Sequence, residues 1–349
     1  LGVAQLMKFS AALLIPYFFL LTLAAYIIGL WWSDGSKKPL QQARSYLWSL
    51  VLVFLIGYIL VFFVYMVFSW NYPAAKQAFD TKAILDSLRN RPLADAIVWM
   101  SGVPLLRHFT HYLLGLLMAA QRAAWGNTVY FLGEVSSTGW WYYFPVAFLL
   151  KEPIPSLVMM AMALFASLFS FIKLFVQALF GKFRKVAEYF NTYFPEFAMG
   201  LFIVLYWAYS MQSNLNIGVR HILPTLPFIY ILTAGVVKKW FSIDALGRVR
   251  NFAFKILIVY NEFLSLSLKS LAFMALLVWY FVTPWYAAPH FLSYFNIFGG
   301  GLMNGYRSIT DSNYDWGQDL KRLAVFVEKE HINKIAVDYF GGGSPRYYL

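Results

Sequence analysis

The sequence predicts an all-α membrane protein of several spans, followed by the start of a small external α/β domain. Two observations carry this prediction. Hydrophobic residues make up 60% of the 349 positions and charged residues only 13%, against about 25% charged in a soluble domain. The apolar residues also come in blocks of about 20, the length that crosses roughly 30 Å of hydrocarbon. The absence of Cys excludes disulfides and Cys-based metal or nucleophile chemistry.

Six segments are long or apolar enough to be membrane spans, and together they form a predicted transmembrane domain over residues 1–284. The predicted spans cover about residues 11–30, 46–69, 154–176, 197–211, 221–237 and 264–283. The fourth and fifth are short and joined by a polar turn, which is typical of a hairpin of spans. The sixth holds Lys269 near one end, where its ammonium can reach the interface.

Basic residues in short loops predict the orientation of the chain. The loops after the first, third and fifth predicted spans carry clusters of Lys and Arg, and such loops face the cytoplasm. The loop 70–153, the turn 212–220 and the tail 285–349 are then external, in a cytoplasmic (inner) membrane with both ends of the chain outside. The net charge of +12 is a property of the basic loops, so it does not indicate nucleic acid as a partner.

The long external loop is not evenly polar. Residues 111–125 combine leucines with Gln121 and Arg122, which predicts a helix lying in the interface. The aromatic run 140–144, which includes Trp141 and Tyr143, has two interpretations. It is either an aromatic belt at the level of the lipid headgroups or a stacking surface for a sugar or an isoprenoid chain.

The tail has the pattern of a water-exposed domain. Its apolar stripe predicts an amphipathic helix over residues 317–332, with Asp315 and Gln318 as a capping box at the start. The alternation in residues 334–340 predicts a strand that ends at a glycine run. A helix followed by a strand indicates a small α/β domain over residues 285–349.

Arg220 and His221 are the strongest candidates for binding an anion. They precede Pro224 and Pro227 at the predicted external end of the fifth span, and two prolines in one span are tolerated mainly where the helix lines a cavity or meets other protein. Arg matches phosphate oxygens in a bidentate fork. The alternative is a pair of membrane anchors. Lys8, near the external end of the first span, is a weaker second cation for the same anion.

Three further charged residues flank the aromatic run as possible substrate-lining groups. Lys151 and Glu152 precede Pro153 at the start of the third span, where an ordinary helix start is the competing explanation. Glu134 is a conceivable general base, although a carboxylate that organises the loop is the alternative.

The densest polar cluster of the sequence lies in the tail. It consists of Asp311, Asn313, Asp315 and Asp319, which helix caps and Asx turns explain and which lack the glycine and terminal glutamate of a calcium loop. No nucleotide-binding or zinc-protease motif occurs, and the five His show no ligand spacing. No metal site and no cofactor is therefore predicted, although a divalent metal stays open.

Four stretches resemble the bacterial membrane glycosyltransferases of family 39, relatives of protein O-mannosyltransferases and of the lipid A aminoarabinose transferase. They are KFSAALLIP, YFLGEVSSTGWWYYFPVAFLLKEPIP, GVRHILPTLPFIY and PHFLSYFNIFGGGLMNGYRSITDSNYDWGQDLKRL. The resemblance runs from Lys8 to the end of the chain. It implies the multispan GT-C architecture and the inverting transfer of a sugar from a polyprenyl-phosphate donor to an external acceptor.

The resemblance also assigns expected roles to particular residues. Arg220, His221 and, less directly, Lys8 would hold the donor phosphate, and Asp311 to Asp319 would lie on the acceptor side of the external domain. The family's catalytic acidic loop matches nothing here, so the catalytic base is expected upstream of Leu1, in a longer protein. The implied partners are the polyprenyl-phosphate-sugar, membrane lipids and a protein, lipid or glycan acceptor.

Two other functions compete with this one. A transporter or flippase of lipid-linked sugars would need paired halves and charges along a path through the membrane, and only Lys269 is plainly intramembrane. A non-catalytic membrane scaffold that presents the tail is the third possibility.

Overall fold

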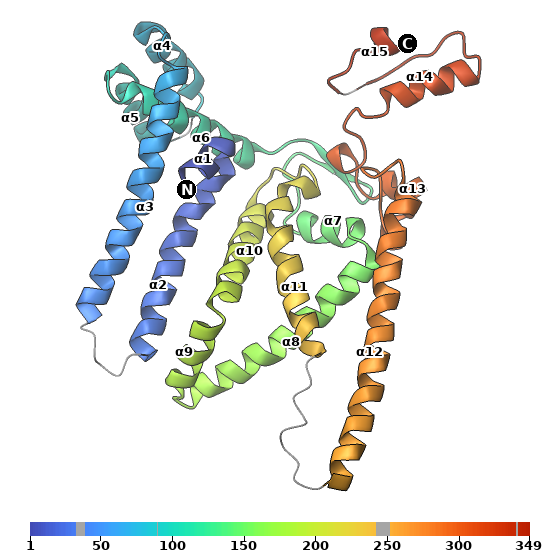
Figure 1. The fold of residues 1–349 in the computed structure, drawn as a ribbon. Coiled ribbons are helices and arrows are strands. Elements are labelled where there is room, and N and C mark those ends of the chain that lie inside the picture. The colour runs from blue at the N-terminus through green and yellow to red at the C-terminus, as the bar shows by residue number, and fades with distance from the viewer. Residues whose placement is uncertain (33–38, 89, 242–251, 340) are drawn as a thin grey trace. The chain divides into compact units, whose positions relative to one another are not determined.

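The structure is a computed structural model that describes residues 1–32, 39–88, 90–241, 252–339 and 341–349 (Figure 1). Its contacts divide the chain into two compact units. Unit 1 consists of residues 1–126 and 173–208, and unit 2 of residues 127–172 and 209–349.

Five helical stretches in the described part of the chain are long and apolar enough to cross a membrane. They are Phe9–Trp31, Gln41–Phe68, Ile154–Leu179, Phe194–Gln212 and Leu264–Ala287. These confirm five of the six predicted spans as long apolar helices, and the chain is a multi-pass membrane protein. The side of the membrane that each loop faces stays a prediction.

The predicted span 221–237 is not one continuous helix. Two short 3-10 turns, η2 (Val219–His221) and η3 (Leu223–Thr225), come first, and helix α11 (Leu226–Trp240) has only 15 residues. Proline lacks an N–H and is best accommodated in the first turn of a helix, and Pro227 lies in the first turn of α11. At 1.5 Å per residue, α11 is about 22 Å long, shorter than a typical span.

Unit 1 contains two of the long helices, α2 (Leu14–Trp32) and α3 (Pro39–Phe68), with smaller helices around them. The other elements are α1 (Gly2–Met7), η1 (Phe9–Leu13), α4 (Ala74–Leu85), α5 (Arg91–Gly102), α6 (Arg107–Trp125), α9 (Phe183–Thr192) and most of α10 (Phe194–Gln212). Helices α4, α5 and α6 enclose a small core of Leu85, Ala94, Ile97 and Leu114. Helix α6 confirms the helix predicted over residues 111–125 and begins four residues earlier.

Unit 2 begins with a short antiparallel hairpin, β1 (Val129–Phe131) and β2 (Glu134–Ser136), in which Val129 pairs with Ser136. Helix α7 (Tyr143–Lys151), the start of α8 (Ile154–Leu179), α11 and α12 (Phe252–Ala287) follow. The tail holds η4 (Ile297–Gly299), α13 (Gly301–Asn304), η5 (Gly305–Arg307), η6 (Asp311–Asn313), α14 (Leu320–Lys329) and α15 (Pro345–Tyr348).

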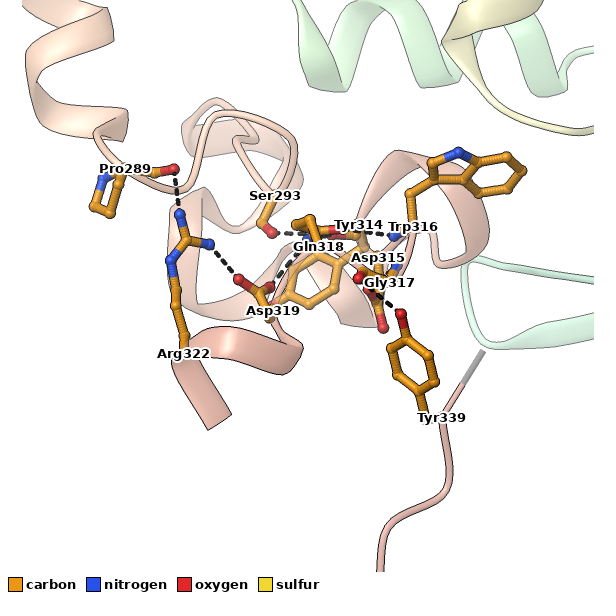
Figure 2. A network of polar contacts seen from close by, with 10 residues as sticks. All are labelled: Pro289, Ser293, Tyr314, Asp315, Trp316, Gly317, Gln318, Asp319, Arg322 and Tyr339. Carbon is orange, nitrogen blue, oxygen red and sulfur yellow. Dashed lines mark hydrogen bonds and ion pairs between the residues drawn. The ribbon is translucent and has the colours of Figure 1, made fainter. Parts of the chain in front are cut away.

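The predicted start of the tail helix is wrong, and Figure 2 shows why. Helix α14 begins at Leu320, with Asp319 as its N-cap residue and no side-chain cap bond. The two residues of the predicted capping box instead form the turn before the helix. A carboxylate oxygen of Asp315 accepts the N–H of Gly317 at 2.8 Å, and the amide oxygen of Gln318 accepts the N–H of Trp316 at 2.7 Å.

The strand predicted over residues 334–340 is also wrong within the described residues 334–339, which form no regular structure. A strand needs a neighbour to complete its hydrogen bonds, and this segment has no ladder of backbone hydrogen bonds. The hydroxyl of Tyr339 ties it to the turn by donating to the carbonyl of Gly317 at 3.0 Å. The described residues of the tail therefore contain helices and no strand, and the α/β domain and its boundary at residue 285 stay predictions.

Candidate functional site

Helix α7 positions the candidate site because its end is fixed by the sequence. The pyrrolidine ring of Pro153 disfavours helical backbone in the residue before it, and Glu152 is extended with ψ 138°. Tyr143 and Phe144, in the first turn of α7, are fully buried. The helix therefore holds a buried aromatic pair at one end and the Lys151–Glu152 pair at the other.

Asn313, from the tail, is the centre of the site. The Asn313 side chain is buried; its amide nitrogen donates to the Tyr143 hydroxyl at 2.9 Å and its amide oxygen accepts the N–H of Val219 at 3.0 Å. The neighbouring Ser312 hydroxyl donates to the carbonyl of Ile217 at 2.5 Å. One short tail segment thus joins α7 to the loop that precedes Arg220.

Lys151 is held by the same tail. Its ammonium donates to the carbonyls of Asn313 and Leu292, both at 2.6 Å, and lies 4.4 Å from the centroid of the Phe295 ring. No carboxylate pairs with it among the described residues. Burial, which penalises the charged form, lowers the pKa of Lys151 to about 7.

Glu152 points to a different set of partners. Its carboxylate accepts the Tyr230 hydroxyl of α11 at 2.8 Å, and its main-chain carbonyl accepts the Asn296 amide at 2.8 Å. Burial raises the pKa of Glu152, while hydrogen bonds from Ser156 and Tyr230 act in the opposite direction. The adjacent acid and base are therefore both enclosed and do not form an ion pair with each other.

The Arg220 side chain is held at two points and has donors that no hydrogen bond uses within the described residues. Its Nε donates to the carbonyl of Ile217 at 3.1 Å, and its guanidinium lies 4.0 Å from the centroid of the Trp316 ring. Among the described residues no carboxylate pairs with it, and no hydrogen bond uses its terminal nitrogens. These nitrogens can therefore bind an anion with the fork geometry that Arg provides.

His221 has a different environment from Arg220. The His221 side chain is buried, and its ring stacks on the rings of Phe144 at 5.4 Å and Tyr209 at 6.4 Å. It packs the end of α7 against the loop and presents less surface to a ligand. Of the two residues predicted from sequence, Arg220 therefore has donors available to an anion, whereas the ring of His221 is packed between aromatic side chains.

One of the other predicted residues contributes to this cluster, and the rest differ in their own local surroundings. Tyr143 belongs to it, and Asp311 raises the pKa of Tyr143 as a minor cause after burial. Trp141 is 67% exposed, which suits either interpretation of the aromatic run. Glu134 is exposed on the β hairpin, and Lys8 is exposed between α1 and η1 of unit 1.

The acidic residues that follow in the tail have structural contacts of their own. Asp315 closes the turn described above, and Asp319 forms an ion pair with Arg322, which also donates to the carbonyl of Pro289 at 3.1 Å (Figure 2). An acceptor-side role for these residues stays a prediction. No group of three or more His, Asp or Glu side chains in the described ranges could hold a metal ion.

Two asparagines of the site were not predicted. Asn296 donates to the carbonyls of Leu149 and Glu152 and accepts the N–H groups of Phe298 and Gly299. Asn216 accepts the N–H of Trp140 at 2.7 Å. Asn is a preferred N-cap residue, so its place before the glycine run was a usable signal for Asn296, whereas nothing in the local pattern marks Asn216.

No family model, curated protein or solved structure matches the chain.

Proposed function

We propose that this chain is part of a membrane glycosyltransferase that moves a sugar from a polyprenyl-phosphate donor to an acceptor at the membrane surface. The observation that carries the proposal is Arg220, an arginine without a carboxylate partner among the described residues, held by the Ile217 carbonyl and the Trp316 ring. The resemblance of the motifs around it to family 39 supports the same function.

The chemistry assigns Arg220 a defined role. The acceptor hydroxyl attacks the anomeric carbon, its proton passes to a base, and the bond from that carbon to the phosphate oxygen breaks. Negative charge then collects on the departing polyprenyl phosphate. A preorganised guanidinium stabilises such charge more strongly in a water-poor site than in bulk water. Lys151 and Asn313 act as positioning residues, because they fix the tail against α7 and the loop before Arg220.

The experiment compares three variants of the complete gene product in membranes supplied with a radiolabelled polyprenyl-phosphate-hexose. Arg220→Ala should lower transfer by about 10- to 100-fold, since hydrogen bonds to charged groups contribute about 1.5–3 kcal/mol. Arg220→Lys, which keeps the charge and loses the fork, should be intermediate. The matched control is Arg307→Ala, because Arg307 is an exposed tail arginine whose Nε donates to the neighbouring Tyr306 and which forms no ion pair among the described residues.

Unchanged transfer by a folded Arg220→Ala variant would remove the phosphate-binding role. Movement of labelled donor across the membrane without transfer to any acceptor would instead favour a flippase.

A further inference from the structure

A second site lies in unit 2, at one end of two membrane-spanning helices. A pocket of about 560 Å³ is formed by the first residue of α8, the last turns of α12 and the tail segment 294–301. This volume is within the roughly 300–1,000 Å³ of small-molecule pockets. Since α8 begins and α12 ends there, the pocket lies near the membrane surface, within reach of water-soluble groups.

The wall of this pocket combines aromatic rings with polar groups. Trp279, Tyr286 and Tyr294 contribute aromatic side chains, and Thr283 and the peptide groups around Gly300 contribute polar atoms. Phe295 forms a buried part of the wall, where Gly299 packs so closely that an added Cβ would come within 2.7 Å of its ring. The wall is therefore fixed before any ligand binds, which reduces the entropy lost on binding.

The charge of the pocket selects the class of ligand. None of the residues that line it in the described structure is charged. Behind the wall lie one base and one acid, Lys151 against the Phe295 ring and Glu152 beside Tyr294. The pocket offers no cation to pair with a phosphate and no carboxylate to pair with an ammonium group. The polar groups of the wall, such as the Thr283 hydroxyl that donates to the Trp279 carbonyl at 2.9 Å, keep acceptor capacity that the hydroxyl of a ligand can use and an acyl chain cannot.

We propose that this pocket binds a neutral sugar ring. The apolar face of a pyranose can stack on the exposed rings of Trp279 and Tyr286, which are 49% and 63% exposed, and its hydroxyls can bond the polar wall. The sugar has two possible sources, a glycan acceptor or the headgroup of the lipid-linked donor. These two sources follow from the proposed function, and to that extent the proposal rests on it. The binding of a sugar ring itself follows from the chemistry of the wall, which is the same for both sources.

The test is saturation-transfer NMR on the complete gene product in lipid nanodiscs, with methyl glycosides of mannose, glucose, galactose and N-acetylglucosamine as probes. At least one glycoside should bind, and Trp279→Ala and Tyr286→Ala should each weaken its Kd about tenfold. Tyr286→Phe keeps the ring and should retain most of the affinity. Trp285→Ala is the matched control, since Trp285 lies on the same helix, is 84% exposed and does not line the pocket.

Three results would overturn the proposal: no glycoside binds, Trp285→Ala weakens binding as much as Trp279→Ala, or choline or inorganic phosphate displaces the glycoside. Competition with a polyprenyl-phosphate-hexose then identifies which of the two sources supplies the bound sugar. Displacement assigns the pocket to the donor sugar and no displacement to the acceptor, and both uphold the sugar site. Binding is measured without turnover, so failure here is distinct from failure of the Arg220 experiment.

Discussion

Replacement of Asn313 by Ala should loosen the candidate site by a calculable amount. The substitution removes the buried side-chain bond to the Tyr143 hydroxyl, the part-buried bond from the N–H of Val219 and a longer bond to the carbonyl of Thr310 at 3.3 Å. A buried polar group left without a partner costs about 1–3 kcal/mol. The Tyr143 hydroxyl also interacts with the backbone of Gly218, so it keeps one partner in the variant. The cost of losing its bond to Asn313 is therefore near the lower end of this range. The expected decrease in the free energy of unfolding is about 2–4 kcal/mol.

The assay is denaturant unfolding in detergent micelles, followed by the fluorescence of the 13 tryptophans. Asn333→Ala is the control, because Asn333 is an exposed asparagine of the tail without a side-chain hydrogen bond in the structure; its effect should be below about 0.5 kcal/mol. A double-mutant cycle with Tyr143→Phe isolates the contact itself. Once the hydroxyl is gone, Asn313→Ala should be milder by about 1 kcal/mol.

Two outcomes would refute the reasoning. If Asn313→Ala destabilises no more than Asn333→Ala, the tail does not depend on this side chain. If the effects of Asn313→Ala and Tyr143→Phe simply add, the bond between these two residues is not a source of stability.

Further predictions concern the backbone, the pH dependence and the orientation. Gly218→Ala should lower the thermal stability more than Gly133→Ala does. The φ values of +96° and +94° strain an alanine at either position by about 1–3 kcal/mol, but only at Gly218 would the new Cβ also lie 2.6 Å from a serine hydroxyl. Equal decreases in the melting temperature of the two variants would contradict this. Between pH 7 and 10 the free energy of unfolding should rise more in the wild type than in Lys151→Met. The folded pKa of Lys151 is about 7, so in this window the lysine is protonated in the unfolded chain and largely neutral in the folded one, and stability rises with pH. Parallel pH profiles of the two proteins would disprove this. In this Cys-free chain, an impermeant maleimide should label Ser137→Cys in intact cells and Lys182→Cys only after permeabilisation, and the reverse pattern would invert the predicted topology.

The hydropathy of the sequence was sufficient to predict the long apolar helices. A block of about 20 apolar residues has one favourable state in a bilayer, a hydrogen-bonded helix, so five of the predicted spans appear where composition placed them. The same rule failed for residues 221–237, since hydropathy counts apolar residues and does not register that Pro224 and Pro227 delay the start of α11.

The tail shows what depends on distant partners. Its alternating residues 334–339 have the composition of a strand and no neighbour that pairs with them, because strand formation depends on a partner as well as on propensity. The side chains of Asp315 and Gln318 were read as a helix cap, but they bond the turn that precedes the helix.

The sequence by itself determined that the chain spans a membrane repeatedly and that Cys chemistry is absent, and it predicted Arg220, Lys151 and Asn313 as candidate site residues. Only the tertiary structure decided that these stretches meet. The Asn313 side chain reaches Tyr143 across 170 positions of sequence and its carbonyl accepts Lys151 across 162. Periodicity and hydropathy report on neighbours within a few turns of chain, whereas burial and the partners of a charged group are set by residues far away in the sequence.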